Sequence, residues 1–259
     1  MGYNKSGLKS LDRTIDIIEL FAKRPYSLSV QEISDTLKVN RTTIYKALNT
    51  LCERKYLEKI PNTSRYKLGF RMYEIGQKYK YSYPFTLPSQ ECSSAIYNEF
   101  NLHLSLGTYQ GNNMVQLLLT RMPTSVYTSN LYPYIYCICA HSSALGKVLL
   151  AGIEDSELEE SVRAFDYHAF TPNTIITPDA LLSTIAEVRK NGCAYDEEEY
   201  LLNTCCVAAP IVDYSGKTVA GISITRIPLV FYKENRDVLS NRVKTSAIQI
   251  SRSIGWDSV

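Results

Sequence analysis

The sequence of 259 residues lacks the patterns that mark the common hydrolase and nucleotide-binding enzymes. It has 3 histidines, none beside a convincing nucleophile motif, and no G-x-S-x-G, P-loop or G-x-G-x-x-G pattern. No apolar run approaches the roughly 18 residues of a membrane-spanning helix. The first residues include no apolar core of a secretory signal. We therefore expect a cytoplasmic protein with no catalytic residues, no cofactor and no membrane partner.

Cysteine usage gives no sign of disulfides or of a metal site. Seven cysteines are an odd number in a chain too long for a disulfide-stabilised miniprotein, which favours reduced thiols. Cys137 and Cys139 lie close to His141, but this spacing fits no standard zinc site. Only His168 and the cysteines at residues 205–206 could complete such a site from afar. Because cysteine is among the most commonly buried residues, we interpret these thiols as core residues and expect no metal.

Charge is divided unevenly along a chain whose formal net charge is only +2. Residues 1–81 hold 16 Lys and Arg against 8 Asp and Glu, and residues 82–259 hold 12 against 18. The two parts therefore carry net charges of +8 and −6. A basic part joined to an acidic remainder is typical of nucleic-acid binding by one domain only. The length allows about two domains, each with its own core.

Residues 27–69 predict two short helices followed by a small wing of two strands. Ser29 caps the first helix, and Glu32 three residues later completes a capping box. After a turn of three residues, Asn40 caps a second helix over residues 41–55. Two helices joined in this way are typical of a helix-turn-helix, whose second helix enters the major groove of DNA.

The second helix has one apolar face and one polar face. At about 100° per residue, its apolar face is formed by Ile44, Ala47, Leu48 and Leu51. Hydroxyls, an amide and cations on the other face can bond base edges and phosphates. Strands at residues 56–60 and 65–68 form the wing, with a turn at residues 61–64. The predicted DNA-contacting residues are Arg41, Thr42, Thr43, Tyr45, Lys46 and Asn49 of the helix and Lys59, Arg65 and Lys67 of the wing.

Two further helices flank the helix-turn-helix in the sequence. Residues 8–22 predict an amphipathic helix that closes the core of the first domain. Its predicted inward-facing residues are Leu11, Ile15, Ile18, Leu20 and Phe21. Residues 70–81 predict a linker helix that Pro84 ends, because the residue before proline disfavours the α region. The apolar stripe of this linker, free to pair with a second copy, is formed by Met72, Ile75 and Tyr79.

The remaining sequence mixes helices with strands joined by hairpins, which predicts an α+β domain around one sheet. Helices are expected at residues 91–100, 142–151, 178–191 and 232–254. Strands are expected at residues 102–109, 114–120, 193–196, 205–212 and 219–225. Turn residues at 110–113 and 214–217 indicate antiparallel hairpins. The predicted division is a winged helix-turn-helix at residues 1–68, a linker helix at 69–83 and an α+β domain at 84–259.

Five segments occur in a characteristic order behind the wing. They are residues 65–69 (RYKLG), 141–147 (HSSALGK), 192–199 (GCAYDEEE), 206–210 (CVAAP) and 221–225 (GISIT). With them the chain, from about residue 8 to residue 254, resembles an IclR-family bacterial transcription regulator. The resemblance implies a GAF-like effector-binding domain and homodimers or homotetramers on double-stranded, palindromic operator DNA. Repression and activation both remain open.

The resemblance also implies an effector pocket at matching motif positions. The implied effector-binding residues are Ala144, Leu145, Asp196, Cys206, Ser223 and Thr225. The start of the predicted helix at residues 142–151 offers unpaired backbone N–H groups, which favour an anion. The acid and the two hydroxyls can bond hydroxyl or carbonyl groups. A small organic acid is therefore the expected effector.

Three residues depart from the family's pattern, and two alternative functions stay open. Asn203 stands where relatives usually have glycine, and Cys205 at a position often basic or polar, so a constitutive DNA-binding regulator without a ligand is one alternative. Arg226 replaces a usually small residue and either reaches a ligand carboxylate or faces solvent. The acidic run at residues 196–199 could serve an enzyme with an accessory winged helix. Four acids after a strand are more often a solvated turn.

Overall fold

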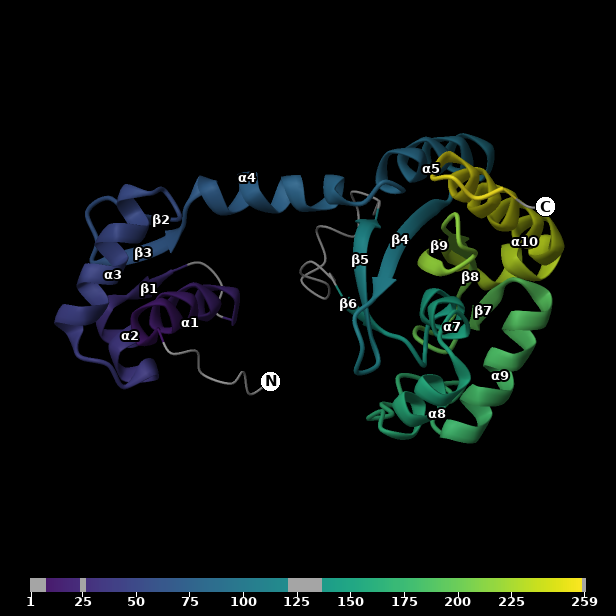
Figure 1. Cartoon of the computed structure of the whole chain (residues 1–259), viewed down its shortest axis with the longest axis horizontal. Helices are drawn as coiled ribbons and strands as arrows, with labels where there is room; N and C mark the ends of the chain where they lie inside the picture. The colour runs from purple at the N-terminus through teal and green to yellow at the C-terminus, as the bar shows by residue number, and fades with distance from the viewer. Residues whose placement is uncertain (1–7, 24–26, 121–136, 258–259) are drawn as a thin grey trace. The chain divides into compact units, whose positions relative to one another are not determined.

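The computed structural model describes residues 8–23, 27–120 and 137–257. Contacts within the chain divide it into two compact units, Met1–Ser82 and Tyr83–Val259 (Figure 1). The first unit contains a three-stranded sheet and the second a six-stranded sheet, and helices pack on both. This arrangement confirms the predicted α+β fold class. None of the helices in the described ranges is long and apolar enough to cross a membrane.

The first unit contains four α-helices and a small antiparallel sheet within its described residues. The helices are α1 (Lys9–Lys23), α2 (Val30–Leu37), α3 (Arg41–Glu53) and α4 (Phe70–Tyr79), and a 3-10 turn (Lys80–Ser82) follows α4. The strands are β1 (Leu28–Ser29), β2 (Leu57–Lys59) and β3 (Arg65–Leu68), in the order β1-β3-β2. The strand β1 was not predicted, because two residues are too few to show an alternating pattern.

Side-chain caps start α2 and α3 at the predicted residues. The Glu32 N–H donates to Ser29 Oγ at 3.2 Å, and the Ser29 N–H donates to Glu32 Oε2 at 2.8 Å, which completes the capping box. The Thr43 N–H donates to Asn40 Oδ1 at 2.8 Å. Lys38 ends α2 in the left-handed region at φ 53°. Each cap stabilises its helix by about 1 kcal/mol, so short-range interactions determine where these two helices begin.

The predicted inward face of α1 is partly wrong. Ile17 and Phe21 are buried in the core with residues of α2 and α3, whereas Leu11 and Ile15 are 51% and 46% exposed. Leucines and isoleucines occupy two faces of this helix, and periodicity alone does not say which face the unit covers. The apolar stripe of the linker helix agrees better with the prediction. Ile75 and Tyr79 of α4 are exposed, and Met72 is half-buried.

The second unit is built on one antiparallel sheet of six strands. Its strands are β4 (His103–Tyr109), β5 (Met114–Thr120), β6 (Cys137–Cys139), β7 (Ala194–Glu197), β8 (Thr204–Val212) and β9 (Thr218–Pro228), in the order β6-β5-β4-β9-β8-β7. Its described helices are α5 (Thr86–Phe100), α7 (Ala144–Ala151), α8 (Asp155–Arg163), α9 (Pro178–Asn191) and α10 (Leu229–Ser253). The turn before β5 and the turn before β9 confirm the two predicted hairpins.

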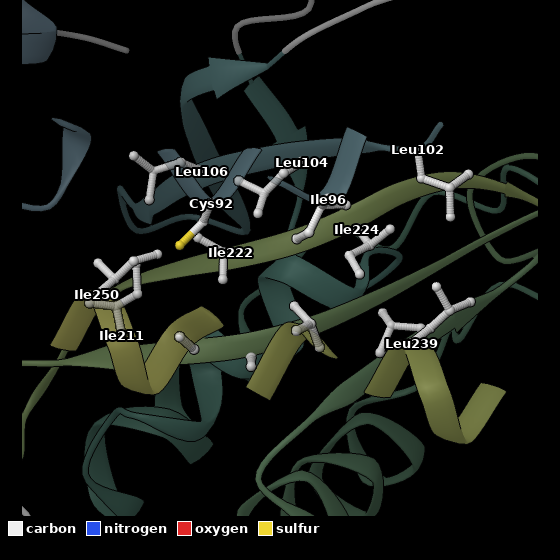
Figure 2. Packing of buried hydrophobic residues seen from close by; sticks show 14 of the residues in the cluster. Cys92, Ile96, Leu102, Leu104, Leu106, Ile211, Ile222, Ile224, Leu239 and Ile250 are labelled. Carbon is white, nitrogen blue, oxygen red and sulfur yellow. The ribbon is translucent and has the colours of Figure 1, made fainter. Parts of the chain in front are cut away.

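Alternating side chains of the sheet divide the second unit into two layers. Leu104 and Leu106 of β4 and Ile222 and Ile224 of β9 pack with α5 and α10 on one face (Figure 2). Residues between them face α7, α8 and α9, where a separate cluster includes Leu145. Because side chains in a strand alternate with a period of two, small and polar residues at the intervening positions are placed next to α7.

Several bounds in the second unit differ from the prediction. The α5 helix begins five residues early at Thr86, and Pro88 is tolerated because a proline in the first turn costs no helical hydrogen bond. The short elements β6 and α8 were not predicted. Cys137 is exposed on β6, so the interpretation of the cysteines as core residues is wrong for this thiol. No three metal-ligating side chains come together in the parts of the chain that the structure describes.

Candidate functional site

The polar face of α3 lies on the surface of the first unit. Ile44, Leu48 and Leu51 are buried, which anchors the helix on the core. Among the predicted DNA-contacting residues, those exposed on α3 are Arg41, Thr42, Tyr45, Lys46 and Asn49. Thr43 is half-buried, and its N–H serves the Asn40 cap. The structure therefore presents hydroxyl, amide, phenol and cationic groups on one accessible surface, as a helix that reads a DNA groove requires.

Two of the predicted wing contacts have partners within the unit. The guanidinium of Arg65 donates to Ser27 Oγ at 2.8 Å and to the Ser27 carbonyl at 2.9 Å, and it lies 3.0 Å from a carboxylate oxygen of Glu32. Lys67 pairs with Glu58 at 3.2 Å. Arg65 therefore fastens the wing to the start of α2. DNA contacts by Arg65 and Lys67 remain predictions, since both pairs are open to solvent.

All six implied effector-binding residues line a single cavity of the second unit. The cavity lies between the N-terminus of α7, the α7 face of the sheet and the segment that follows β7. Its lining comprises Ser105, Leu117, Ile138, Ser143, Ala144, Leu145, Asp196, Tyr200, Leu201, Thr204, Cys206, Ser223, Thr225 and Arg226. The volume of the cavity that the centre of a water molecule can occupy is about 100 Å³. One water needs roughly 10–15 Å³ by this measure, so the cavity has room for a small organic molecule.

Two glycines let α7 approach the sheet at one end of this cavity. A Cβ atom on Gly107 would lie 2.8 Å from Leu145 Cδ2, and one on Gly221 would lie 2.9 Å from Leu145 Cδ1. A larger residue at either position would force the Leu145 side chain to shift. Ser105 and Ser223 pair directly across β4 and β9, two residues along from the glycines. Their hydroxyl-bearing side chains therefore form the floor of the cavity beside the start of α7.

The N-terminus of α7 borders the cavity, since Ser143, Ala144 and Leu145 are among the residues that line it. Ser143 Oγ accepts from the Gly146 N–H at 3.1 Å and donates to the Cys139 carbonyl at 2.8 Å. This cap leaves the N–H groups of Ala144 and Leu145 without an acceptor among residues 8–23, 27–120 and 137–257. Such donors carry a partial positive charge and suit a carboxylate or carbonyl oxygen.

Asp196 supplies a buried acid to the lining of the cavity. Its Oδ1 accepts the N–H groups of Glu199 at 2.8 Å and Tyr200 at 3.3 Å. Burial, together with the nearby Glu199 charge, raises the pKa of Asp196 to about 6 against the opposing effect of these N–H groups and of Lys147. Burial, followed by the Asp196 charge, raises the pKa of the Cys206 thiol, so this thiol stays protonated. The neutral thiol can therefore donate a hydrogen bond, and the carboxyl group of Asp196 can accept one.

Comparison with known families identifies both units. Residues 10–61 match the family described as IclR helix-turn-helix domain. Residues 106–252, more than half of the chain, match the family described as Bacterial transcriptional regulator IclR C-terminal. The chain belongs to the IclR family of transcriptional regulators. The prediction of a DNA-binding regulator with a C-terminal effector domain, and not an enzyme, is thereby confirmed.

Individual relatives extend over nearly the whole chain. HTH-type transcriptional regulator XynR of Escherichia coli (strain K12) is 23% identical over 253 residues, which cover 96% of this chain and 98% of the relative. The Thermotoga maritima IclR crystal structure is 25% identical, with a TM-score of 0.78 over 96% of this chain and 100% of that chain. An IclR homolog from Microbacterium hydrocarbonoxydans, solved as a complex with 4-hydroxybenzoate, is 18% identical with a TM-score of 0.78 over 95% and 99% of the two chains.

A buried ion pair next to the cavity is one feature that was not predicted from the sequence. Lys147 of α7 is 1% exposed, pairs with Glu199 and donates to the Tyr195 carbonyl at 2.9 Å. The Glu199 carbonyl in turn accepts from Thr174 Oγ1 at 2.6 Å and Thr171 Oγ1 at 3.2 Å. These bonds hold the segment after β7 against α7. The sequence did contain one sign of a buried charge, because Lys147 is the single cation in an otherwise apolar helix. Its partner Glu199 lies far along the chain and could not be identified from the sequence.

Glu199 also corrects the interpretation of the acidic run. Residues 196–199 were expected to form a solvated turn, but Asp196 and Glu199 are only 4% and 8% exposed. Glu197 is the exposed member, and Glu198 is half-buried at φ 64°. The N–H bonds to Asp196 and the Lys147 pair turn two of the four acids inward, which composition alone does not show.

Two of the three departures from this IclR-family pattern have simple structural explanations. Asn203 adopts φ 61°, in the left-handed region where glycine is favoured and asparagine is well tolerated. Cys205 is 0% exposed and faces the α5 and α10 layer, so it does not line the cavity. Arg226 does line it. The first two departures therefore place no side chain in the lining of the cavity.

The free energy of unfolding of the ligand-free second unit is expected to fall as pH rises from about 4 to about 6 through Asp196. The unfolded carboxyl ionises near its ordinary pKa of 3.8, while the folded one keeps its proton until about pH 6. Below about pH 4 the Asp196 carboxyl group is protonated in both the folded and the unfolded state, and above about pH 6 it is ionised in both. The stability is therefore lost between these two pH values. A difference of about two pKa units corresponds to roughly 3 kcal/mol. Thermal unfolding of the full chain at several pH values measures it.

Asp196→Asn is the matched control for this pH dependence. The amide oxygen can keep the N–H bonds from Glu199 and Tyr200, but the side chain never ionises. The variant should therefore lose less stability than wild type between these pH values. Equal slopes for the two proteins would show that Asp196 is not the group responsible.

Proposed function

We propose that this IclR-family protein binds operator DNA through the exposed face of α3 and responds to a small hydroxylated or keto organic acid held in the cavity of its second unit. One observation carries the proposal: Ala144, Leu145, Asp196, Ser223 and other implied effector residues, far apart in sequence, line a single cavity. The N–H groups at the start of α7 favour an anionic oxygen, and the acid and hydroxyls favour a hydroxyl or carbonyl group.

The apolar part of the lining completes this description of the effector. Leu117, Ile138, Leu145 and Leu201 provide walls, as in most small-molecule sites. The homolog of the same fold solved with 4-hydroxybenzoate, a hydroxylated acid, supports this class of ligand. A neutral lipid would leave the N–H groups at the start of α7 without an acceptor, which costs free energy.

Calorimetric titration of Ser223→Ala tests the effector half of the proposal. The acid used is whichever member of a panel of hydroxy, keto and aromatic acids raises the melting temperature of the wild type. Loss of the Ser223 hydroxyl, which is 1% exposed on the cavity floor, should weaken binding by about 1–3 kcal/mol. The matched control is Ser89→Ala, which removes a buried hydroxyl of α5 on the other side of the sheet. Equal acid affinities for Ser223→Ala and wild type would show that the acid binds elsewhere.

Replacing Thr42 or Tyr45 with alanine is expected to relax operator specificity at particular base pairs. Each good base contact contributes on the order of 1–3 kcal/mol of discrimination. The unit should stay folded, because both side chains are exposed and lie off the Ile44 and Leu48 face. Binding to operator variants with single base changes measures the effect, and Thr245→Ala, at an exposed position of α10, is the control. An unchanged ratio of operator to random-DNA affinity would mean that another face reads the bases.

We further propose that the chain works as a homodimer or homotetramer. The exposed apolar residues of α4, among them Phe70 and Tyr73 with ring centroids 5.7 Å apart, offer a surface for a second copy. In this proposal residues 1–68 bind DNA, 69–83 form the linker and 84–259 bind the effector. A two-fold dimer places two recognition helices about one turn of DNA apart. Light scattering that gave a monomer on operator DNA would contradict it.

The structure gives less support than the sequence to the alternative of a constitutive DNA-binding regulator without a ligand. That alternative rested on Asn203 and Cys205, and neither lines the cavity. A regulator without a ligand has no reason to keep unpaired N–H groups and a buried acid in the lining of one cavity, because burying such groups costs stability. Absence of any thermal shift across the acid panel would restore this alternative.

A further inference from the structure

The alternation of side chains along β9 breaks where the strand passes the cavity. Ile222 and Ile224 face the α5 and α10 layer, so residue 226 would face it too in a regular strand. The next residue in that layer is instead Ile227, and Arg226 lines the cavity on the opposite face. Both Thr225 and Arg226 therefore lie on the cavity side of the sheet.

The pairing of β9 with β8 shows the cause of this break. Val207 pairs with Ile224, and Cys205 pairs with Ile227, so the register shifts between the two pairs. Cys206 alone lies opposite the two residues Thr225 and Arg226, which is the arrangement of a β-bulge. Bulges often occur beside functional sites, where the extra residue redirects a side chain. Here the redirected side chain is an arginine.

The backbone of Arg226 carries strain in this position. Its φ is 55°, in the left-handed region that β-strand residues other than glycine avoid. Residues held in this region store on the order of 1–3 kcal/mol of strain, and they cluster at sites where the strained geometry is used. Asparagine or glycine would adopt this conformation at lower cost. The arginine side chain is therefore the feature that needs an explanation.

Arg226 brings a positive charge to the end of the cavity away from the two glycines. Among the described residues that line the cavity, Arg226 is the one Lys or Arg residue and Asp196 is the one Asp or Glu residue. Along β9, Gly221 lies under Leu145, Ser223 forms the floor, and Arg226 follows three residues later. The N–H groups of α7 and the guanidinium of Arg226 are thus two separate places for anionic oxygens, with hydroxyl groups between them.

We infer that Arg226 receives a second carboxylate, so that the effector is a short dicarboxylic acid with a hydroxyl or keto group between its ends. One carboxylate binds the N–H groups of Ala144 and Leu145, and the other forms a paired contact with the planar guanidinium. The central oxygen meets Ser223 and Asp196. The small cavity limits the carbon chain to a few atoms. This inference rests on the proposed function, because it names the acid that the same cavity holds.

Two matched pairs of acids test the inference by calorimetry on the full chain. Malate is compared with 2-hydroxybutyrate, and 2-oxoglutarate with 2-oxopentanoate, so that each pair differs by one carboxylate replaced with methyl. The wild type is expected to prefer the dicarboxylate of at least one pair by about tenfold to a hundredfold, as a charge-assisted hydrogen bond provides. Arg226→Asn should reduce this preference to about threefold or less and leave the affinity for the monocarboxylate nearly unchanged.

Two further measurements separate recognition from misfolding. Arg226→Asn should melt at the wild-type temperature or above it without ligand, because asparagine tolerates the left-handed region better than arginine. Arg226→Lys keeps the charge but not the planar fork, and should retain part of the preference. An Arg226→Asn protein that keeps the full preference would overturn the inference. Binding of neither dicarboxylate, while another acid changes operator affinity, would overturn it and leave the proposed function standing. If no acid changed operator affinity, the proposed function would fail as well.

Discussion

Lys147→Met is expected to lower the free energy of unfolding of the second unit by about 3–5 kcal/mol. Methionine has a similar length and no charge, so the main change is that the Glu199 carboxylate is left without its cation. That carboxylate is buried, and its Oε2 already has no hydrogen-bond partner among the described residues. Burial raises the pKa of Glu199 even with Lys147 present. Denaturant unfolding of the full chain, followed in the second unit, measures the loss.

Two variants make this result specific. Glu199→Gln added to Lys147→Met removes the unpaired charge, so the double variant should recover part of the lost stability. Arg163→Met breaks two exposed ion pairs, with Glu159 and with Asp179, in which the three side chains are 52%, 59% and 84% exposed. It should lower the free energy of unfolding far less than Lys147→Met does, because solvent screens exposed pairs. Equal losses for the buried pair and the exposed pairs would contradict the role assigned to Lys147.

Operator affinity is expected to fall about a thousandfold or more when salt rises from roughly 50 to 200 mM. The first 81 residues carry the excess of positive charge, and each phosphate that they neutralise releases bound counterions. Lys46→Ala should reduce the slope of log affinity against log salt by about one, because the variant no longer neutralises one phosphate. Lys217→Ala, which removes an exposed cation of the second unit, should leave the slope unchanged.

A nearly flat dependence on salt would contradict the electrostatic part of the account. Filter binding or fluorescence anisotropy with a labelled operator gives the slope directly. If Lys46→Ala lowered affinity without changing the slope, this lysine would contact bases and not phosphates.

Local interactions explain why the helix-turn-helix could be predicted from the sequence. Ser29 with Glu32 and Asn40 with Thr43 act within three residues, so the starts of α2 and α3 follow from the residue types alone. The inward face of α1 could not be predicted as securely. Leu11 and Ile15 belong to one apolar face and Ile17 to another, and only the packing of the unit decides which face is covered.

The cavity was located through matching motifs, and its chemistry was only partly visible in them. Ser223 and Thr225 follow the period of two along β9, so their common face could be predicted. Arg226 could not be placed, because a bulge against Cys206 reverses the alternation. Glu199 was assigned to solvent because its partner Lys147 lies 52 residues away in the chain. Interactions of this range depend on the whole fold and leave no pattern in a short stretch of sequence.

The most direct test of the central claim measures the affinity of the full chain for its operator with and without a saturating acid. The acid is the one that raises the melting temperature, and Ser223→Ala is measured in parallel. We predict that the acid changes wild-type operator affinity by about 5- to 150-fold, the usual range of coupling between two sites. At an acid concentration that saturates only the wild type, Ser223→Ala should respond less, while its operator affinity without acid equals that of the wild type. An operator affinity that stays the same when the cavity is saturated would contradict the account.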